Sequence, residues 1–171
     1  ITGVAYTSEY SLGYQLPMPP KSSMELLKKP KIFSAGENIK LTASTNSAIK
    51  TIITAEKITD TNSDFFGRGV TCTTENTYYD LFTATNASMV RSLLISNKNA
   101  NYDTRVTVVL TDGSNNILGY FASELIMPAN STLELLDTDK FVFTGYKIRI
   151  SSTSANYIDA IVSGRRVYTL G

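Results

Sequence analysis

Polar and apolar residues alternate along much of the second half of this chain, which is the pattern of β-strands with one buried face. Residues 105–111 are the clearest example, because Val106, Val108 and Leu110 fall on one side. The same reasoning predicts strands at residues 78–82, 89–96, 117–127, 147–151 and 158–167. Turn residues separate these segments, and no long amphipathic helix lies between them. We therefore expect an antiparallel β-sandwich or barrel.

Residues 16–58 repeat the pattern of residues 125–167 at a fixed offset of 109 positions, without a gap. Twelve of the 43 aligned positions are identical, where composition alone gives about three. Most other positions keep their chemical class. The identical pairs are Leu16/Leu125, Met18/Met127, Pro19/Pro128, Ser22/Ser131, Glu25/Glu134, Leu26/Leu135, Leu27/Leu136, Lys31/Lys140, Gly36/Gly145, Ile39/Ile148, Ile49/Ile158 and Ile52/Ile161.

The repeat predicts that the two copies superpose strand for strand. Gly36 and Gly145 are expected at equivalent turns, where glycine tolerates a positive φ. After each turn the sequence alternates polar and apolar positions, as in a half-buried strand. The expected inward-facing residues are Ile39, Leu41, Ile148 and Ile150, with Lys40 and Arg149 outward.

Residues 22–27 are the ambiguous part of the first copy. Ser23 is a suitable cap for a short helix, and the residues that follow favour helix. The counterpart at residues 131–141 holds β-branched and Asp-rich positions instead. A strand is therefore the favoured interpretation.

The expected fold class is all-β, with tandem antiparallel β-sandwich units of jelly-roll or Ig-like type. Residues 1–59 are interpreted as a partial unit, residues 60–74 as a polar, glycine-bearing linker, and residues 75–171 as a complete sandwich. The first unit lacks a counterpart of residues 78–109. Residues upstream of Ile1 or the linker itself are alternatives, but we favour a neighbouring chain that covers the first unit, with an interface above ~1,000 Å².

Composition limits the partners of the chain. Sixteen basic and fifteen acidic residues give a net charge of +1, so we expect no nucleic-acid partner. No apolar run approaches the ~18 residues that span a bilayer, so no membrane partner is expected. The abundance of Ser, Thr and Asn, with only 18% charged residues, is typical of secreted or virion β-proteins.

The side-chain chemistry favours a protein that is not an enzyme. The sequence holds no histidine, which removes histidine triads and histidine metal sites. The glycines at positions 67 and 69 are too close together for a phosphate-binding loop. The carboxylates Asp60, Asp64, Asp137 and Asp139 are interpreted as loop and turn groups, although two converging carboxylates in a pocket would revive an enzymatic hypothesis. No cofactor is expected.

Two further residue types could bind a metal or react. Asp137 and Asp139 are weak calcium candidates, because calcium takes oxygen ligands from loops. The first copy has Lys28 and Pro30 at those places, so such a site would belong to one unit only. Cys72 is the single cysteine, which excludes an intrachain disulfide, and we interpret it as a buried apolar residue.

Tyrosines form the remaining candidate surface. Tyr6, Tyr10 and Tyr14 lie in an extended N-terminal segment and are interface candidates. Together with tyrosines of the second unit they offer an alternative, a surface on which sugars stack. The chain holds no tryptophan, which favours core and interface roles.

The order of the segments SLLISN, RVTVVLTDG, MPANSTLEL and YKIRISS resembles the small β-sandwich modules of structural proteins in tailed bacteriophages. The resemblance covers about residues 76–167. It implies a virion component of the tail, neck or capsid exterior, without enzymatic activity, whose partners are copies of itself and other virion proteins. The alternative hypothesis is a secreted or virion-surface carbohydrate-binding or adhesin module, located outside the cell, with a host-surface glycan as its partner.

Overall fold

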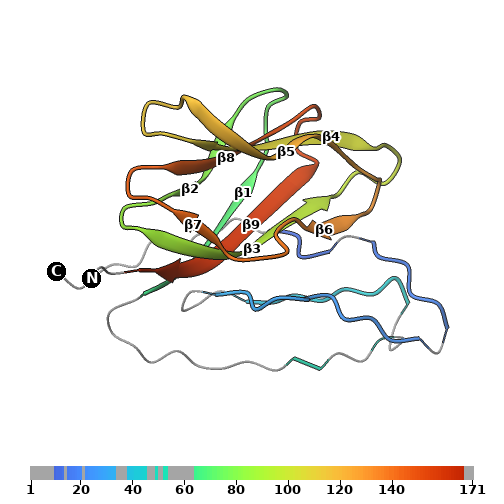
Figure 1. The fold of residues 1–171 in the computed structure, drawn as a ribbon. Coiled ribbons are helices and arrows are strands. Elements are labelled where there is room, and N and C mark those ends of the chain that lie inside the picture. Colours follow the sequence, from blue (N-terminus) through green and yellow to red (C-terminus); the bar gives the residue numbers. More distant parts are fainter. Residues whose placement is uncertain are drawn as a thin grey trace.

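The structure is a computed structural model that describes residues 10–13, 15–20, 22–33, 38–45, 49, 52–53 and 64–167. Within these ranges the chain forms nine β-strands and no helix. Accordingly, the described part of the chain contains no helix long and apolar enough to cross a membrane. All nine strands lie between residues 65 and 166 and make two antiparallel sheets (Figure 1).

The first sheet has the strand order β1-β9-β3-β6, and β7 also pairs with β3. Its strands are β1 (Phe65–Thr71), β3 (Ser88–Asn97), β6 (Thr132–Glu134), β7 (Lys140–Val142) and β9 (Ile158–Arg166). The long central strands β3 and β9 pair along nearly their whole length. Short β6 and β7 complete the edge beyond β3.

The second sheet has the strand order β2-β8-β4-β5. Its strands are β2 (Tyr79–Thr83), β4 (Thr104–Thr111), β5 (Ile117–Met127) and β8 (Lys147–Ser152). With β6 and β7 counted as one interrupted strand, the two sheets have the strand order of a jelly roll, a fold that virus capsid and lectin domains share. The topology thus selects the jelly-roll form of the expected sandwich.

The core fills the space between the sheets. The side chains of Ile148 and Ile150 are fully buried there, as the alternation predicts. Arg149, between them, lies on the opposite face of β8 and its Nε contacts Asp80 Oδ1 at 2.7 Å. At one edge, Phe66 of the first sheet stacks on Phe82 of the second with ring centroids 4.1 Å apart.

The strand predictions for the second unit are confirmed. Strands β2, β3, β4, β5, β8 and β9 lie where the alternation places them, within one or two residues. Gly145 has a φ of +84° at the turn before β8, as expected for its turn position. The short strand β7 was not predicted.

The predicted linker at residues 60–74 contains strand β1. This strand pairs with β9, so the sandwich begins at Phe65 and not after residue 74. Glycines at two of its seven positions hid the strand, because glycine is depleted from strands. The division of the chain into two units stays a prediction.

The prediction that the two copies superpose strand for strand is wrong for the described residues, since those of the first copy form no strand. Ile39 and Leu41 are expected to face inward, but they are 40% and 55% exposed. Lys40, expected to face outward, is exposed as well. The physical reason is the missing partners: β8 lies between β2 and β4, and β9 between β1 and β3. No second copy of those flanking strands occurs among the described residues. Gly36 lies outside the described residues.

Candidate functional site

Part of the outer face of the first sheet is buried, although it is polar. Ser92 and Ser96 of β3 lie opposite Ser163 and Asp159 of β9, and all four side chains are at most 1% exposed. Leu94 and Ile161 form the pair between them. We call this surface the arm-binding face, after the N-terminal segment that covers it.

The cover of this face is the chain's own N-terminal segment. We call the described residues between 10 and 33 the arm. Figure 1 shows the arm, in blue, running along the side of the sandwich that β3, β9 and β6 form. The arm forms no strand there. Its contacts are therefore individual hydrogen bonds and side-chain packing.

One end of the arm is fixed at Asp159. The main-chain nitrogen of Ser11 donates to Asp159 Oδ2 at 2.8 Å, and Ser96 Oγ donates to the Ser11 carbonyl at 2.8 Å. Asp159 also accepts from Thr71 Oγ1 at 2.7 Å and pairs with Lys98 Nζ at 2.9 Å. The buried carboxylate is thus fully partnered.

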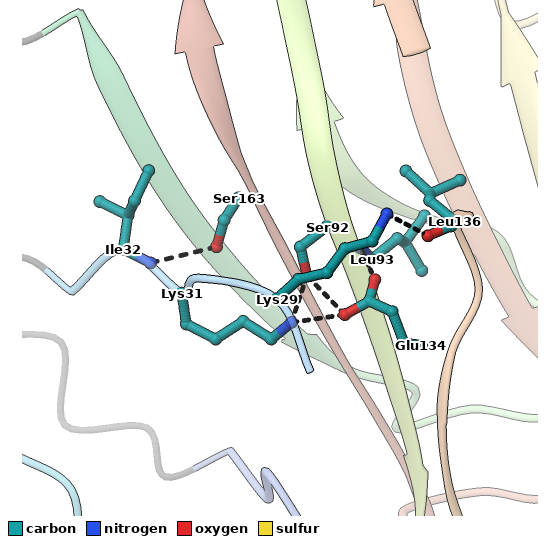
Figure 2. Close-up of polar contacts among 8 residues, drawn as sticks. All are labelled: Lys29, Lys31, Ile32, Ser92, Leu93, Glu134, Leu136 and Ser163. Atoms are coloured by element: carbon teal, nitrogen blue, oxygen red, sulfur yellow. Dashed lines mark hydrogen bonds and ion pairs between the residues drawn. The ribbon is translucent and has the colours of Figure 1, made fainter. Parts of the chain in front are cut away.

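The other end of the arm is fixed at Glu134. Lys31 Nζ lies 2.5 Å from Glu134 Oε2, with the two side chains 1% and 11% exposed, and it also contacts Ser92 Oγ. Figure 2 shows both carboxylate oxygens in use, because Oε1 accepts from the main-chain nitrogen of Leu93 at 2.7 Å. A buried ion pair offsets its own desolvation only when its geometry is good, so it specifies the position of the arm more than it stabilises the fold.

Two further bonds lie next to this ion pair (Figure 2). Lys29 Nζ donates to the carbonyl oxygen of Leu136 at 2.5 Å, and the nitrogen of Ile32 donates to Ser163 Oγ at 3.4 Å. Lys29 and Lys31 therefore both point toward the first sheet. For two lysines so close in sequence, this is the arrangement of a docked segment.

Glycines of β1 leave room for the arm. A Cβ atom on Gly67 would lie 2.2 Å from the carbonyl oxygen of Ile32, and one on Gly69 would lie 2.5 Å from Cδ2 of Tyr10. Both positions face the same side of β1, since they are two residues apart. The glycines that hid this strand in the sequence are those the arm needs.

The second set of notable residues is apolar and exposed at the sheet edges. On β5, which pairs only with β4 among the described strands, the exposed large apolar side chains are Ile117, Leu118, Tyr120 and Ile126, at 45%, 50%, 60% and 55%. At β7, Phe141 and Phe143 are 43% and 59% exposed and meet edge to face at 5.1 Å.

The structure places the candidates from the sequence as follows. Tyr6 and Tyr14 lie outside the described residues. Tyr10 is half-buried against Gly69 of its own chain. Asp137 and Asp139 are exposed, and Asp139 Oδ2 lies 3.5 Å from Arg91 Nε. No cluster of three or more His, Cys, Asp or Glu occurs in the described ranges, and the calcium site stays a prediction.

A cavity of about 260 Å³ lies at the edge where β1 and β2 meet. Asp80 is the one carboxylate in its lining, with Arg68 and Arg166 the charged neighbours. Asp80 is already held by Lys147 at 3.1 Å as well as by Arg149. The cavity therefore offers no pair of carboxylates for glycoside hydrolysis.

The residues that hold the arm were missed by sequence reasoning. Lys31 and Glu134 are 103 positions apart, so no local pattern connects them. The repeat carried one signal, because Lys31 matches Lys140 and Glu134 matches Glu25. These matches single out Lys31 and Glu134 but do not indicate that the two residues contact each other.

No protein-family model and no curated protein matches this chain. Two crystal structures of a pentameric capsid protein isolated from metagenomic phage sequences show some likeness, each at 18% identity and a TM-score of 0.35. The alignments cover 70% and 72% of this chain, and 82% and 83% of the other chains. A likeness at this TM-score carries no argument about function.

Proposed function

We propose that this chain is a non-enzymatic structural component of a bacteriophage particle, located in the virion, which binds copies of itself and other particle proteins. The observation that carries the protein contact is the set of exposed apolar side chains on β5. A sheet edge that presents several such side chains to water marks a contact with another protein. The virion location is supported by the resemblance of residues 76–167 to β-sandwich modules of phage structural proteins.

The backbone of β5 indicates the kind of contact. Its pairing with β4 shifts register three times, and Glu124 has a φ of 48°. Bulges of this kind bend an edge strand and disfavour the addition of another strand. A partner is therefore expected to pack on the side chains of β5, with Tyr120 and Ile126 as the largest exposed anchors.

The rest of the molecule supports a structural role. The jelly roll is shared by capsid and lectin domains, so the fold alone leaves an assembly protein and a sugar-binding protein as alternatives. The arm supports an assembly protein, because a long segment that docks on a sheet is able to connect units. The cavity between β1 and β2 has Asp80 as its one carboxylate.

Sedimentation of the full chain over a range of concentrations tests the proposal. We expect self-association that Ile126→Lys weakens by about tenfold or more, because a charge would be buried in the contact. Met24→Lys is the matched control, since Met24 is 46% exposed but lies in the arm. A chain that stays monomeric at all concentrations, or that associates equally well with Ile126→Lys, contradicts this use of β5.

A second candidate function is carbohydrate binding at one end of the sandwich. Tyr102 and Tyr157 are 70% and 43% exposed. Their carbonyl oxygens accept from Asn97 Nδ2 and the Lys98 nitrogen, so both loops lie at the same end. Binding of a glycan that is lost in Tyr102→Ala would favour this function.

A further inference from the structure

We infer that the arm-binding face accepts the arm of a second copy of this chain in place of its own, so that neighbouring copies exchange arms. The inference rests on the proposed function, which brings copies close together. It names the partner as an identical chain and the contact as the arm, the described residues between 10 and 33, on the first sheet.

The first argument is the polarity of the contact. Ser11, Lys29, Lys31 and Ile32 contact the sandwich through main-chain or charged groups. When the arm leaves, the serines and carboxylates under it regain water, and Leu94 and Ile161 form an apolar pair among them. The face can therefore exist uncovered for a time, which an apolar core surface cannot.

The second argument is specificity. The arm is fixed at two points with different chemistry, a main-chain nitrogen on Asp159 and a buried cation on Glu134. A foreign segment would have to place both groups correctly, because an unpaired buried charge is strongly disfavoured. An identical arm from another copy satisfies both without change.

The third argument is reach. Thirty residues, 34–63, separate Phe33 from Asp64, and thirty residues span at most ~100 Å when fully extended. A connection of this length allows an arm to reach an adjacent sandwich. It also gives the chain's own arm an effective concentration near the millimolar range. Exchange is therefore expected in an assembly and not in dilute solution.

A fourth observation fits the same arrangement. Ile39, Leu41, Ile52 and Ile53 follow the arm in sequence and are 40%, 55%, 94% and 57% exposed while the arm lies on its own sandwich. Apolar side chains this exposed are expected to be covered by a protein. In an exchanged pair these residues pass between two copies, where a second chain is at hand.

Variants with a reversed charge at Lys31 or Glu134 distinguish an arm that docks on its own sandwich from an arm that docks on a second copy. Lys31→Glu places two carboxylates together, and Glu134→Lys places two ammonium groups together, so neither variant can dock its own arm. In an equimolar mixture each arm meets an opposite charge on the other variant. We expect a heterodimer by native mass spectrometry, with restored protection of the arm against hydrogen exchange. Each variant alone should stay unprotected.

The double variant Lys31→Glu plus Glu134→Lys is the matched control, and it should protect its own arm as a monomer. A mixture without heterodimer, when the double variant does protect its arm, overturns the inference. Thiol labelling of buried Cys72 checks that every variant keeps the sandwich folded.

A second measurement decides the case if the double variant fails to protect its arm. Chains carrying Lys31→Cys are mixed with chains carrying Glu134→Cys under mild oxidation, at a concentration at which the chains self-associate. A disulfide between the two chains supports exchange, and its absence overturns the inference. Repeating the charge-reversal mixture with Ile126→Lys separates the proposals. The arms of these variants cannot dock on their own sandwiches, so exchange between them should not need the contacts at β5.

Discussion

The side-chain amide of Asn97 donates a hydrogen bond of 2.9 Å to the carbonyl oxygen of Met127, inside the sandwich. Asn97 Nδ2 also lies 3.1 Å from the carbonyl oxygens of Tyr102 and Pro128. Its Oδ1 accepts from the nitrogen of Asn99 at 2.9 Å. One fully buried side chain thus joins the end of β3, the loop after it and the end of β5.

We expect Asn97→Ala to destabilise the fold by about 1–3 kcal/mol, the effect of leaving a buried polar group unsatisfied. Asn97→Asp should destabilise it more, since a carboxylate would face three carbonyl oxygens. Chemical denaturation followed by circular dichroism measures both. Asn101→Ala, at an exposed position in the same loop, should change the free energy of unfolding by less than about 0.5 kcal/mol.

The second prediction concerns alkaline pH. Burial raises the pKa of the Cys72 thiol from 9.0 to about 12, and the charge of Asp159 adds to the rise. The unfolded chain ionises this thiol first, so the stability it contributes is complete below pH 9 and is lost as pH rises toward about 12. We expect native protein to resist thiol reagents at pH 8 and to react after denaturation.

The matched control for that prediction is Cys72→Ala. The difference in unfolding free energy between the two proteins should shrink as pH rises above 9, because only one of them can ionise at this position. Other groups titrate equally in both proteins and cancel. A pH-independent difference would contradict the assignment, as would rapid labelling of the folded chain.

The third prediction concerns the core. Ile148 is fully buried in the cluster between the sheets, so Ile148→Ala should lower the free energy of unfolding by about 2–5 kcal/mol. Ile126→Ala removes the same atoms from a side chain that is 55% exposed, and it should have a much smaller effect on the monomer. Equal effects would show that the interior is assigned incorrectly.

The fourth prediction concerns the room that β1 leaves for the arm. Gly67→Ala would bring a methyl group within 2.2 Å of the Ile32 carbonyl oxygen, so the arm must move away. Trypsin should then cut after Lys31, whose side chain is 1% exposed in the docked arm, much faster than in the unaltered chain. Mass spectrometry identifies that cleavage.

Gly119→Ala is the control for the arm, because a Cβ atom there has no neighbour within 4 Å. It should leave cleavage after Lys31 unchanged. If Gly67→Ala also leaves it unchanged, the close approach of the arm to β1 is wrong. Unfolding curves of Gly67→Ala should keep most of their cooperativity, since the strand pairs with β9 through its main chain.

Alternation predicts the sandwich well because β4, β5 and β8 depend on local patterns of burial. It fails for the first copy, since a strand needs flanking strands that the repeat does not bring with it. The same repeat still preserves local structure: Ser22 Oγ bonds the Pro19 carbonyl at 2.6 Å, and Ser131 Oγ bonds that of Pro128 at 2.6 Å. Turn chemistry is local, whereas sheet pairing is not.

The arm contact was hidden for a related reason. Its bonds join residues far apart in the sequence, from 61 positions for Lys31 and Ser92 to 148 positions for Ser11 and Asp159. The clearest sign of this contact in the sequence is the pair of alternate glycines in β1. Taken alone, two glycines so close together predict a loop and not a strand. A serine or aspartate on a strand is normally predicted to face solvent. The hydrophobic pattern therefore does not indicate that the arm buries Ser92 and Asp159.

The separation of Ile32 from Ser163, 131 residues, also fixes an order of events during synthesis. The ribosome makes the arm before the sandwich, and Asp159 and Ser163 on β9 emerge well after the arm. At about 5–20 residues per second, a new arm waits roughly 7–26 s before its own docking surface exists. On a messenger carrying several ribosomes, finished sandwiches stand close to such waiting arms, so pairing between copies can begin before a chain is complete.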